Sequence, residues 1–499
     1  MGKKDKSKKK KGFGIEKTAA KTDKKLLAKQ KKLLQKLGED DIETIVSQLQ
    51  QNPQTQEPTE SLSAPPSPRS NLAVASLDDI IYFHGGEFFN GAKVECFGDL
   101  FAYNTNKNEW KIIKSVPCPT PRSGHQMIST AANGGELWLF GGEFASPSGL
   151  QFYHFRDLWK FSIASKKWEN IKTQNGPSAR SGHRMFLHKK RIILFGGFHD
   201  NNQTFLYHND VWVFSMEKYN WTKIETDGIA PTPRSGVGIG ALSDDKIIVF
   251  GGYTKSSAKA GSERGTTHAD AFILQETSGK WKWNTTKPGG RRPTPRSGVA
   301  CATAPNGRIY IFGGVMDTEE DDENLRGLFS NEIHFLDNQS GGLAWRKVEL
   351  KKKKEAEPEK TAESSSQPTQ AIKTTTDGIF TITVAGSKQE TSTASQSSSQ
   401  LDVGGPSPRM NAAIAIVRHN LWIFGGSYEQ GSRQFTLCDF YSLDINKCDA
   451  WKTHIGNLPS LQWLGSDSED SSDSEKNDDD EDESDDSESE EDSDEMDVN

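Results

Sequence analysis

Short apolar runs, rich in β-branched and aromatic residues, alternate with clusters of Gly, Pro, Asn and Asp along most of the chain. Such runs have the length of β-strands, and the clusters between them are typical of turns. One stretch illustrates the pattern, with predicted strands at 185–187, 191–195, 210–214 and 221–224. The pattern therefore predicts an all-β protein made of groups of four short strands.

These groups are copies of one unit. A double glycine after an apolar run recurs six times, beginning at Gly85, Gly141, Gly196, Gly251, Gly313 and Gly425. The intervals are 55 to 62 residues, except for the last one of 112, which contains a low-complexity insert at 351–403. A fixed period indicates a repeat architecture, because a single four-stranded sheet cannot bury both of its faces alone. Sheets of this kind set around an axis form a closed propeller.

Three further marks keep the register of the double glycine. A PSPR, PTPR or PSAR motif precedes it and ends at Arg69, Arg122, Arg180, Arg234, Arg296 and Arg409. An acid stands before the third strand, at Asp99, Asp157, Asp210, Asp270, Glu332 and Asp439. A tryptophan closes each unit, at Trp110, Trp168, Trp221, Trp281, Trp345 and Trp451. We expect the tryptophans to fill the space between sheets and the acids to cap loops.

The double glycine, the spaced aromatics and the tryptophan resemble the kelch repeat. The resemblance implies a six-bladed kelch-type β-propeller with four-stranded antiparallel blades. Three copies depart from the pattern, at Ala179, Glu332 and Met410, where the others carry proline, aspartate and serine. Two closures of the ring are open. The first and last blades dock as whole sheets, or the stretch 458–464, with Trp463, lies against the first blade.

Charge divides the rest of the chain. Residues 1–36 hold fifteen lysines against three acids, and residues 466–499 hold twenty acids against one lysine, so the net charge of −8 hides two opposite tails. We expect a basic, partly helical tail at 1–36, and a short helix with a Pro-rich linker at 37–64. Blades one to five follow at 65–350, then a disordered insert at 351–403, blade six at 404–464, and a disordered acidic tail at 465–499.

Two short elements are predicted outside the blades. Ile42, Ile45, Val46 and Leu49 have helical spacing after Asp40 or Asp41, one of which we expect to cap the helix. The segment GIFTITV at 378–384 has strand character within the insert. It is equally well interpreted as a lone transient strand or as one that pairs with a blade edge or a partner.

Composition excludes several classes of protein. Hydrophobic residues make up 33% of the chain, mean hydropathy is −0.71, and the lysine-rich N-terminus is not followed by an apolar stretch. We therefore expect no membrane span and no secretion, and place the protein in the cytoplasm, the nucleus or both. The five cysteines show no metal-type spacing and are expected to be reduced thiols.

No catalytic motif is present in the sequence. It lacks G-x-S-x-G, H-E-x-x-H and G-x-x-x-x-G-K-[ST], and also the E-x-x-x-D-x-x-x-H pattern of the kelch-type specifier proteins. His125 and His183 both lie in R-S-G-H at equivalent places, which favours a structural role. We expect no enzyme activity, no metal and no cofactor.

The expected function is a non-enzymatic scaffold for a protein partner. The alternative is a chaperone or assembly factor for basic ribosomal or chromatin clients, which would bind the acidic tail. An enzyme or a ubiquitin-ligase substrate adaptor is less favoured. Contact of the N-terminal lysines with nucleic acid is expected to be non-specific at most, because Phe13 is the only aromatic side chain among them.

Candidate binding residues fall into two sets. The six motif arginines either donate hydrogen bonds across the blade junctions or clamp carboxylates of an acidic peptide at one mouth of the ring. The loops after the first two double glycines carry aromatics, half or more of which should pack on their own blade: Phe88, Phe89, Phe144, Phe152, Tyr153 and Phe155. Candidate phosphorylation sites have an acid three residues later, at Ser466, Ser472, Ser487 and Ser489.

Overall fold

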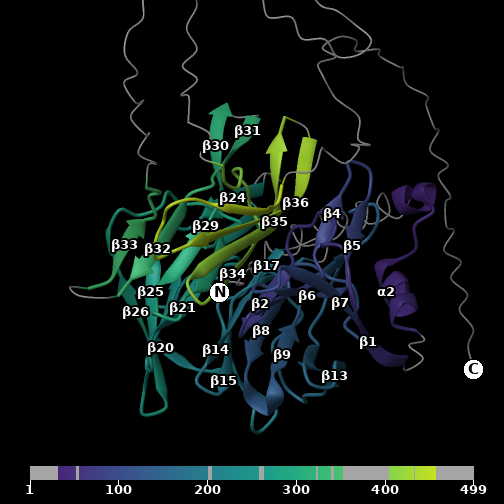
Figure 1. The fold of residues 1–499 in the computed structure, drawn as a ribbon, viewed down its shortest axis with the longest axis horizontal. Helices are drawn as coiled ribbons and strands as arrows, with labels where there is room; N and C mark the ends of the chain where they lie inside the picture. The colour runs from purple at the N-terminus through teal and green to yellow at the C-terminus, as the bar shows by residue number, and fades with distance from the viewer. Residues whose placement is uncertain are drawn as a thin grey trace, which may run out of the picture. The chain divides into compact units, whose positions relative to one another are not determined.

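The computed structural model describes residues 32–51, 56–200, 205–257, 263–321, 324–338, 342–351, 404–431 and 433–456. These residues form six four-stranded antiparallel sheets, as predicted (Figure 1). Most of the basic tail, nearly all of the insert with its segment 378–384, and the acidic tail with its four serines lie outside the described residues.

Each blade is a meander of four strands that follow one another in the chain. The strands are β2 (Ala73–Leu77), β3 (Ile80–His84), β6 (Leu100–Asn104) and β7 (Glu109–Val116) in blade 1; β8 (Gln126–Thr130), β9 (Glu136–Phe140), β12 (Leu158–Ser162) and β13 (Lys167–Ile171) in blade 2; β14 (Arg184–His188), β15 (Arg191–Phe195), β18 (Val211–Ser215) and β19 (Asn220–Ile224) in blade 3; β21 (Gly238–Ser243), β22 (Lys246–Phe250), β25 (Ala271–Thr277) and β26 (Lys280–Thr286) in blade 4; β28 (Ala300–Thr303), β29 (Ile309–Phe312), β32 (Ile333–Asp337) and β33 (Ala344–Lys347) in blade 5; and β34 (Ala413–Val417), β35 (Asn420–Gln430), β36 (Arg433–Asp444) and β37 (Lys452–Ile455) in blade 6.

The blades form a closed ring around their first strands. These strands contact one another in the order β2, β8, β14, β21, β28, β34 and back to β2. Backbone hydrogen bonds follow the same circle: Gly124 N–H donates to Asn71 O at 2.9 Å, and Gly182 N–H donates to Gly124 O at 3.0 Å. Asn71 N–H donates to Asn411 O at 3.2 Å, across the junction between blades 1 and 6. Asn71 and Asn411 have positive φ, a conformation that asparagine tolerates better than most residues.

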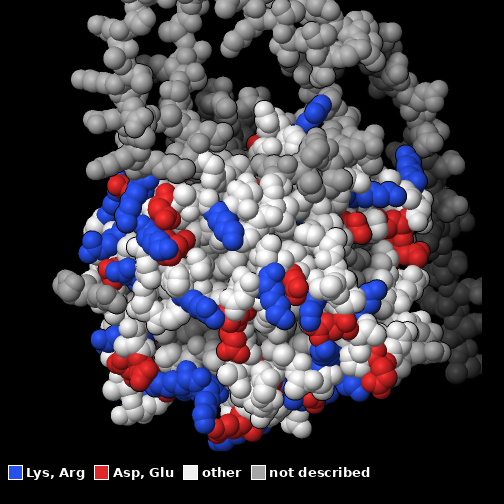
Figure 2. Space-filling view, in the orientation of Figure 1, with Lys and Arg blue, Asp and Glu red and all other residues white. Residues whose placement is uncertain are grey.

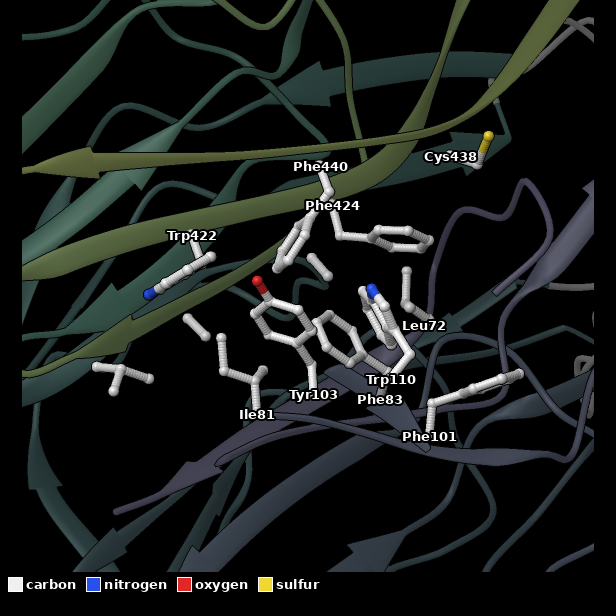
Figure 3. Close-up of a cluster of buried hydrophobic side chains, with 13 residues drawn as sticks. Leu72, Ile81, Phe83, Phe101, Tyr103, Trp110, Trp422, Phe424, Cys438 and Phe440 are labelled. Atoms are coloured by element: carbon white, nitrogen blue, oxygen red, sulfur yellow. The ribbon is translucent and has the colours of Figure 1, made fainter. Parts of the chain in front are cut away.

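Blades 1 and 6 close the ring as two whole sheets, the first of the two expected closures. Aromatic side chains of both blades share one core cluster, in which the ring centroids of Tyr103 and Phe440 are 4.8 Å apart (Figure 3). Gly426 N–H of blade 6 donates to Arg69 O at 3.1 Å, the same contact that Gly142 N–H makes with Arg180 O at an interior junction. The segment 458–464, with Trp463, lies outside the described residues.

The closing tryptophans pack against the preceding blade, and blade 4 adds a second one. The ring centroid of Trp221 lies 5.4 Å from that of Phe140 in blade 2. In blade 4, Trp283 takes the equivalent place, with its ring 5.6 Å from that of Phe195, and the predicted Trp281 is also buried in the core cluster that blades 3 and 4 share. The seven-residue strand β26 carries both tryptophans on one face, because side chains two residues apart in a strand point the same way.

Linkers add a fifth strand to three of the described blades. Residues 56–62, predicted as linker, form β1 (Gln56–Leu62), which runs antiparallel to β7. The strands β20 (Thr226–Gly228) and β27 (Gly289–Gly290) pair in parallel with β26 and β33. These additions occupy backbone donors and acceptors on the outer edges of blades 1, 4 and 5, which an edge strand otherwise leaves unpaired.

The double glycine is required where one blade touches the next. Gly141 and Gly142 have φ of 67° and 92°. A Cβ atom on Gly141 would lie 2.7 Å from Arg180 O of the next blade, and one on Gly142 would lie 2.6 Å from Ser123 O of its own blade. Any side chain would therefore push the backbones apart at this contact.

The predicted short helix is present. It is α2 (Ile42–Gln50), and the carboxylate of its N-cap residue Asp41 accepts a hydrogen bond from Glu43 N–H at 2.9 Å. Residues 32–37, at the end of the basic segment, are also helical. None of the helices in the described part of the chain has the length and apolar character that a bilayer crossing demands.

Candidate functional site

Each repeat arginine is bound inside its own blade. In blade 2, Arg122 is fully buried and donates two hydrogen bonds to the carboxylate of Asp157, at 2.7 and 3.0 Å, and one to Gly141 O at 3.0 Å. The guanidinium thus ties the loop before the first strand to the double glycine and to the start of the third strand. Four other blades repeat the pair, as Arg69–Asp99, Arg180–Asp210, Arg234–Asp270 and Arg409–Asp439.

The structure differs from the prediction in the role of the motif arginines and in the role of the repeat acids. The guanidinium of Arg180 stays within blade 3, whereas its backbone carbonyl crosses the junction and accepts from Gly142 N–H. The repeat acids pair with arginine, and Asp157 also accepts from Trp159 Nε1 at 2.6 Å. Although burial alone would raise it, the charge and hydrogen bonds of Arg122 hold the pKa of Asp157 below its usual value. Partner binding by the arginines stays a prediction.

Blade 5 departs from this arrangement, as its glutamate suggested. Arg296 Nη2 donates to Glu332 Oε2 at 3.0 Å, and Arg296 Nη1 donates to Ser330 Oγ. Lys347 Nζ also donates to Glu332, at 2.5 Å. Burial alone would raise the pKa of Glu332, but the hydrogen bonds from Lys347 and Arg296 lower it to about 2. Two cations therefore share the longer acid.

Hairpins that follow the double glycines form what we call the hairpin crown. It comprises β4 (Glu87–Phe89) with β5 (Val94–Cys96), β10 (Glu143–Ala145) with β11 (Phe152–His154), β16 (Phe198–Asp200) with β17 (Phe205–Tyr207), β23 (Tyr253–Ser257) with β24 (Glu263–Thr267), β30 (Val315–Asp321) with β31 (Asn324–Phe329), and residues 427–437 of β35 and β36. Neighbouring hairpins contact each other at β5 and β10, at β11 and β16, and at β17 and β23. All of the predicted aromatic candidates lie in or beside the first two hairpins.

Helix α2 covers the aromatic part of the second hairpin. Val46 packs with Phe144 and Phe155, which are 8% and 3% exposed. Gln151 of the hairpin loop accepts from Ile42 N–H at 3.1 Å through its side-chain oxygen. These contacts bury two of the six predicted aromatic candidates beneath the chain's own helix.

Polar contacts fix the start of this segment to the same loop. Ser148 donates to the Glu39 carboxylate from its backbone N–H at 2.9 Å and from its hydroxyl at 2.8 Å. Burial opposes ionisation of Glu39, but hydrogen bonds from Ser146, Ser148 and Gln151 lower its pKa overall. The sequence predicted the helix without its docking place, because serine and glutamine in a loop give no sign of a partner.

The other aromatic candidates, Phe88, Phe89, Phe152 and Tyr153, are half-buried, and Tyr153 packs beside α2. Sequence reasoning missed a groove of about 460 Å³ between the hairpins of blades 3 and 4, lined by Phe205, Tyr207, Thr254 and Lys255. Lys255 Nζ lies 4.5 Å from the centre of the Phe205 ring, a cation–π contact. The only sign of this groove in the sequence is that both hairpins lie in the loops of variable length that follow the double glycines.

The central channel is lined by residues of all six blades and has a volume of about 580 Å³. Arg184 reaches across it and donates to Val237 O at 2.8 Å and to Val299 O at 3.1 Å. At the crown end, burial and the neighbouring Glu87 raise the pKa of Glu143 to about 8. Arg184 therefore links the walls of blades 3, 4 and 5 within the channel.

The R-S-G-H histidines are buried, in agreement with a structural role. His125 Nε2 and His84 Nδ1 are 2.9 Å apart, and both residues are 1% exposed. Burial, and then the charges of Arg122 and Arg69, lower the pKa of His84 to about 3. Among the described residues, no group of three His, Cys, Asp or Glu side chains has the arrangement that a metal ion needs.

Comparison with protein families matches residues 43–197 and 194–370 to the KLHDC2/KLHL20/DRC7 Kelch-repeats domain. The chain is 29% identical over 209 residues to the dynein alpha chain of the flagellar outer arm from Chlamydomonas reinhardtii, a match that covers 39% of this chain and 4% of that one. It is 25% identical over 286 residues to the host cell factor homolog hcf-1 from Caenorhabditis elegans, covering 50% of this chain and 34% of the relative.

The chain thus matches only a small part of the length of either relative. Among solved structures, YjhT is similar at 17% identity with a TM-score of 0.48, covering 79% of this chain and 99% of that one.

Proposed function

Because the chain belongs to the kelch-repeat family, whose propellers are protein-interaction domains, we propose that it is a non-enzymatic scaffold that binds a protein partner on its hairpin crown. A rigid ring that carries loops of different length and character is a common arrangement for recognition. The partner is a protein of unknown identity.

Exposed leucines on the crown carry this proposal. Leu150, Leu206 and Leu328 are 36%, 56% and 49% exposed and lie on the hairpins of blades 2, 3 and 5. Leu206 stands between Phe205 and Tyr207, which line the groove beside Lys255. Apolar side chains rimmed by polar ones are typical of protein-binding surfaces.

Charge alone does not mark a binding surface on the face drawn in Figure 2. Figure 2 shows Lys and Arg interspersed with Asp and Glu over the visible face, without a large area of one sign. Five of the six motif arginines are buried in their blades and Arg296 is partly buried, so the proposal rests on crown residues instead of on them.

The test compares two exposed leucines at different places. Leu206→Asp puts a charge on the crown, whereas Leu62→Asp changes a leucine that is 70% exposed on β1. In proximity labelling in cells, we expect Leu206→Asp to lose at least tenfold of the labelling of the main partners and Leu62→Asp to keep it. Equal labelling by both variants would contradict binding on the crown.

We also propose which group of kelch proteins the chain resembles most. The segments GGEFFNG and GGEFASPSG are similar to kelch domain-containing protein 4, and we place the chain near that group.

The second candidate function is capture of basic client proteins by the tail 466–499, which holds twenty acids against one lysine. Unchanged partner recovery after deletion of 466–499 would reject tail capture and leave the crown proposal standing.

A further inference from the structure

A cleft of about 550 Å³ lies between blades 4 and 5, at the linker that joins them. Its lining includes Phe250, Phe272, Ile311 and Trp345, each less than 10% exposed. Figure 1 shows the region on the left, where β25, β26 and β33 are labelled. The volume is in the range of ordinary ligand pockets, and the lining is mostly apolar.

Glycine at one position of the inner strand shapes this lining. A Cβ atom on Gly238 would lie 2.1 Å from the Phe250 ring, so the ring rests directly against the backbone of β21. Blades 1, 5 and 6 carry alanine at the equivalent place, Ala73, Ala300 and Ala413. The glycine lets an aromatic ring form one wall of the cleft.

The rim combines an exposed apolar residue with positive charge. Ile229 is 73% exposed, and Lys287 and Arg292 are both exposed. Arg292 Nε donates to Pro288 O at 3.1 Å, which holds the guanidinium stem beside the linker. Asp270 also lines the cleft, but its carboxylate is paired with Arg234. The net charge that the rim offers to a ligand is therefore positive.

We propose that this cleft is a second binding site, which takes an acidic peptide segment of a protein partner with one large apolar side chain inserted between the blades. The apolar lining accepts the leucine-sized or aromatic side chain, and Lys287 and Arg292 pair with carboxylates on either side of it. The site lies outside the hairpin crown. It therefore goes beyond the proposed function, because it gives the scaffold a lateral contact of its own.

The test uses the full chain and defined peptides. Fluorescein-labelled peptides carry a central Trp, Phe, Leu or Ser between pairs of glutamates, and a further Leu peptide is flanked by lysines. In fluorescence anisotropy we expect at least one apolar acidic peptide to bind tenfold or more tighter than both the Ser peptide and the lysine-flanked peptide. Similar binding of all the peptides, or none, would overturn the proposal.

Variants locate the site. We expect Arg292→Glu and Ile229→Asp each to weaken the peptide at least tenfold, because the first reverses a rim charge and the second repels the flanking acids. Lys282→Glu is the matched control, since Lys282 is an exposed cation of β26 outside the cleft, and we expect less than a twofold change. An equal loss with Lys282→Glu would show non-specific charge attraction and overturn the site. A loss with Leu206→Asp instead would move the peptide to the crown, which rejects the cleft and leaves the proposed function intact.

Discussion

At the scale of single residues, the buried arginine pairs set the stability of each blade. Arg122 is fully buried, so Arg122→Ala leaves the Asp157 carboxylate without its main partner. Removal of one member of such a pair costs about 3 kcal/mol, chiefly because the other charge stays buried and unpaired. We expect urea unfolding, followed by tryptophan fluorescence, to show this loss. Arg156→Ala, which removes an exposed arginine of the same blade, is the control, and equal midpoints for the two variants would contradict the structural role.

The buried histidines make a second prediction at this scale, for pH. His84 has a pKa of about 3 when folded against about 6.5 when unfolded, so the unfolded chain binds more protons between these values. Stability from this residue is therefore present above pH 6.5 and lost as the pH falls. Between pH 7 and pH 5, we expect the unfolding free energy of the wild type to fall by about 2 kcal/mol more than that of His84→Phe.

Phenylalanine suits the site because the next junction already has it. Phe140 faces His183 there, with ring centroids 5.4 Å apart, close to the 5.0 Å between His84 and His125. His419→Phe, which removes a histidine whose side chain is 51% exposed, is the control. The same slope for His84→Phe and the wild type would show that the buried pair does not govern acid sensitivity.

At the scale of elements, the docking of α2 decides which aromatics the crown offers. Val46 is 2% exposed between Phe144 and Phe155, so Val46→Asp places a charge in an apolar contact. We expect the helix to leave the second hairpin, with hydrogen exchange faster at least tenfold in residues 42–50 and little changed in the blades. Gln48→Asp, on the exposed side of α2, is the control. Unchanged exchange in Val46→Asp would contradict docking by this contact.

The same elements show how far sequence reaches. The strands and the ring could be predicted because the double glycine, the arginine and the acid recur in register. Each recurs because it makes the same kind of contact in blade after blade. The site could be predicted only in part. Burial of Phe144 by α2 depends on a long-range contact, and the bridge of Arg184 across the channel depends on ring geometry. Trp283 was missed because strand length, which turn residues set only loosely, decides how many residues of β26 face blade 3.

At the scale of the whole molecule, the junction of blades 1 and 6 differs from the other five. The chain runs directly from each blade to the next, through short linkers or, between blades 5 and 6, through the segment that holds the insert 351–403. Blades 6 and 1 meet through side chains and backbone contacts only. Phe440 is fully buried in this junction, and Phe161 is fully buried in the junction of blades 1 and 2. Truncation of either phenylalanine to alanine costs about 3–5 kcal/mol in a packed core. The two variants should lose a similar amount of stability but differ in how the ring unfolds.

We expect Phe440→Ala to open the ring before it unfolds. In urea below the main transition, hydrogen exchange should accelerate in blades 1 and 6 while blades 2 to 5 keep their protection, because no linker returns the separated blades to contact. Phe161→Ala is the matched control. Its blades remain tethered, the cost of bringing them together again is small, and unfolding should stay cooperative. Loss of protection at the same urea concentration in all blades of Phe440→Ala would mean that packing around the ring, and not the missing linker, determines where it breaks.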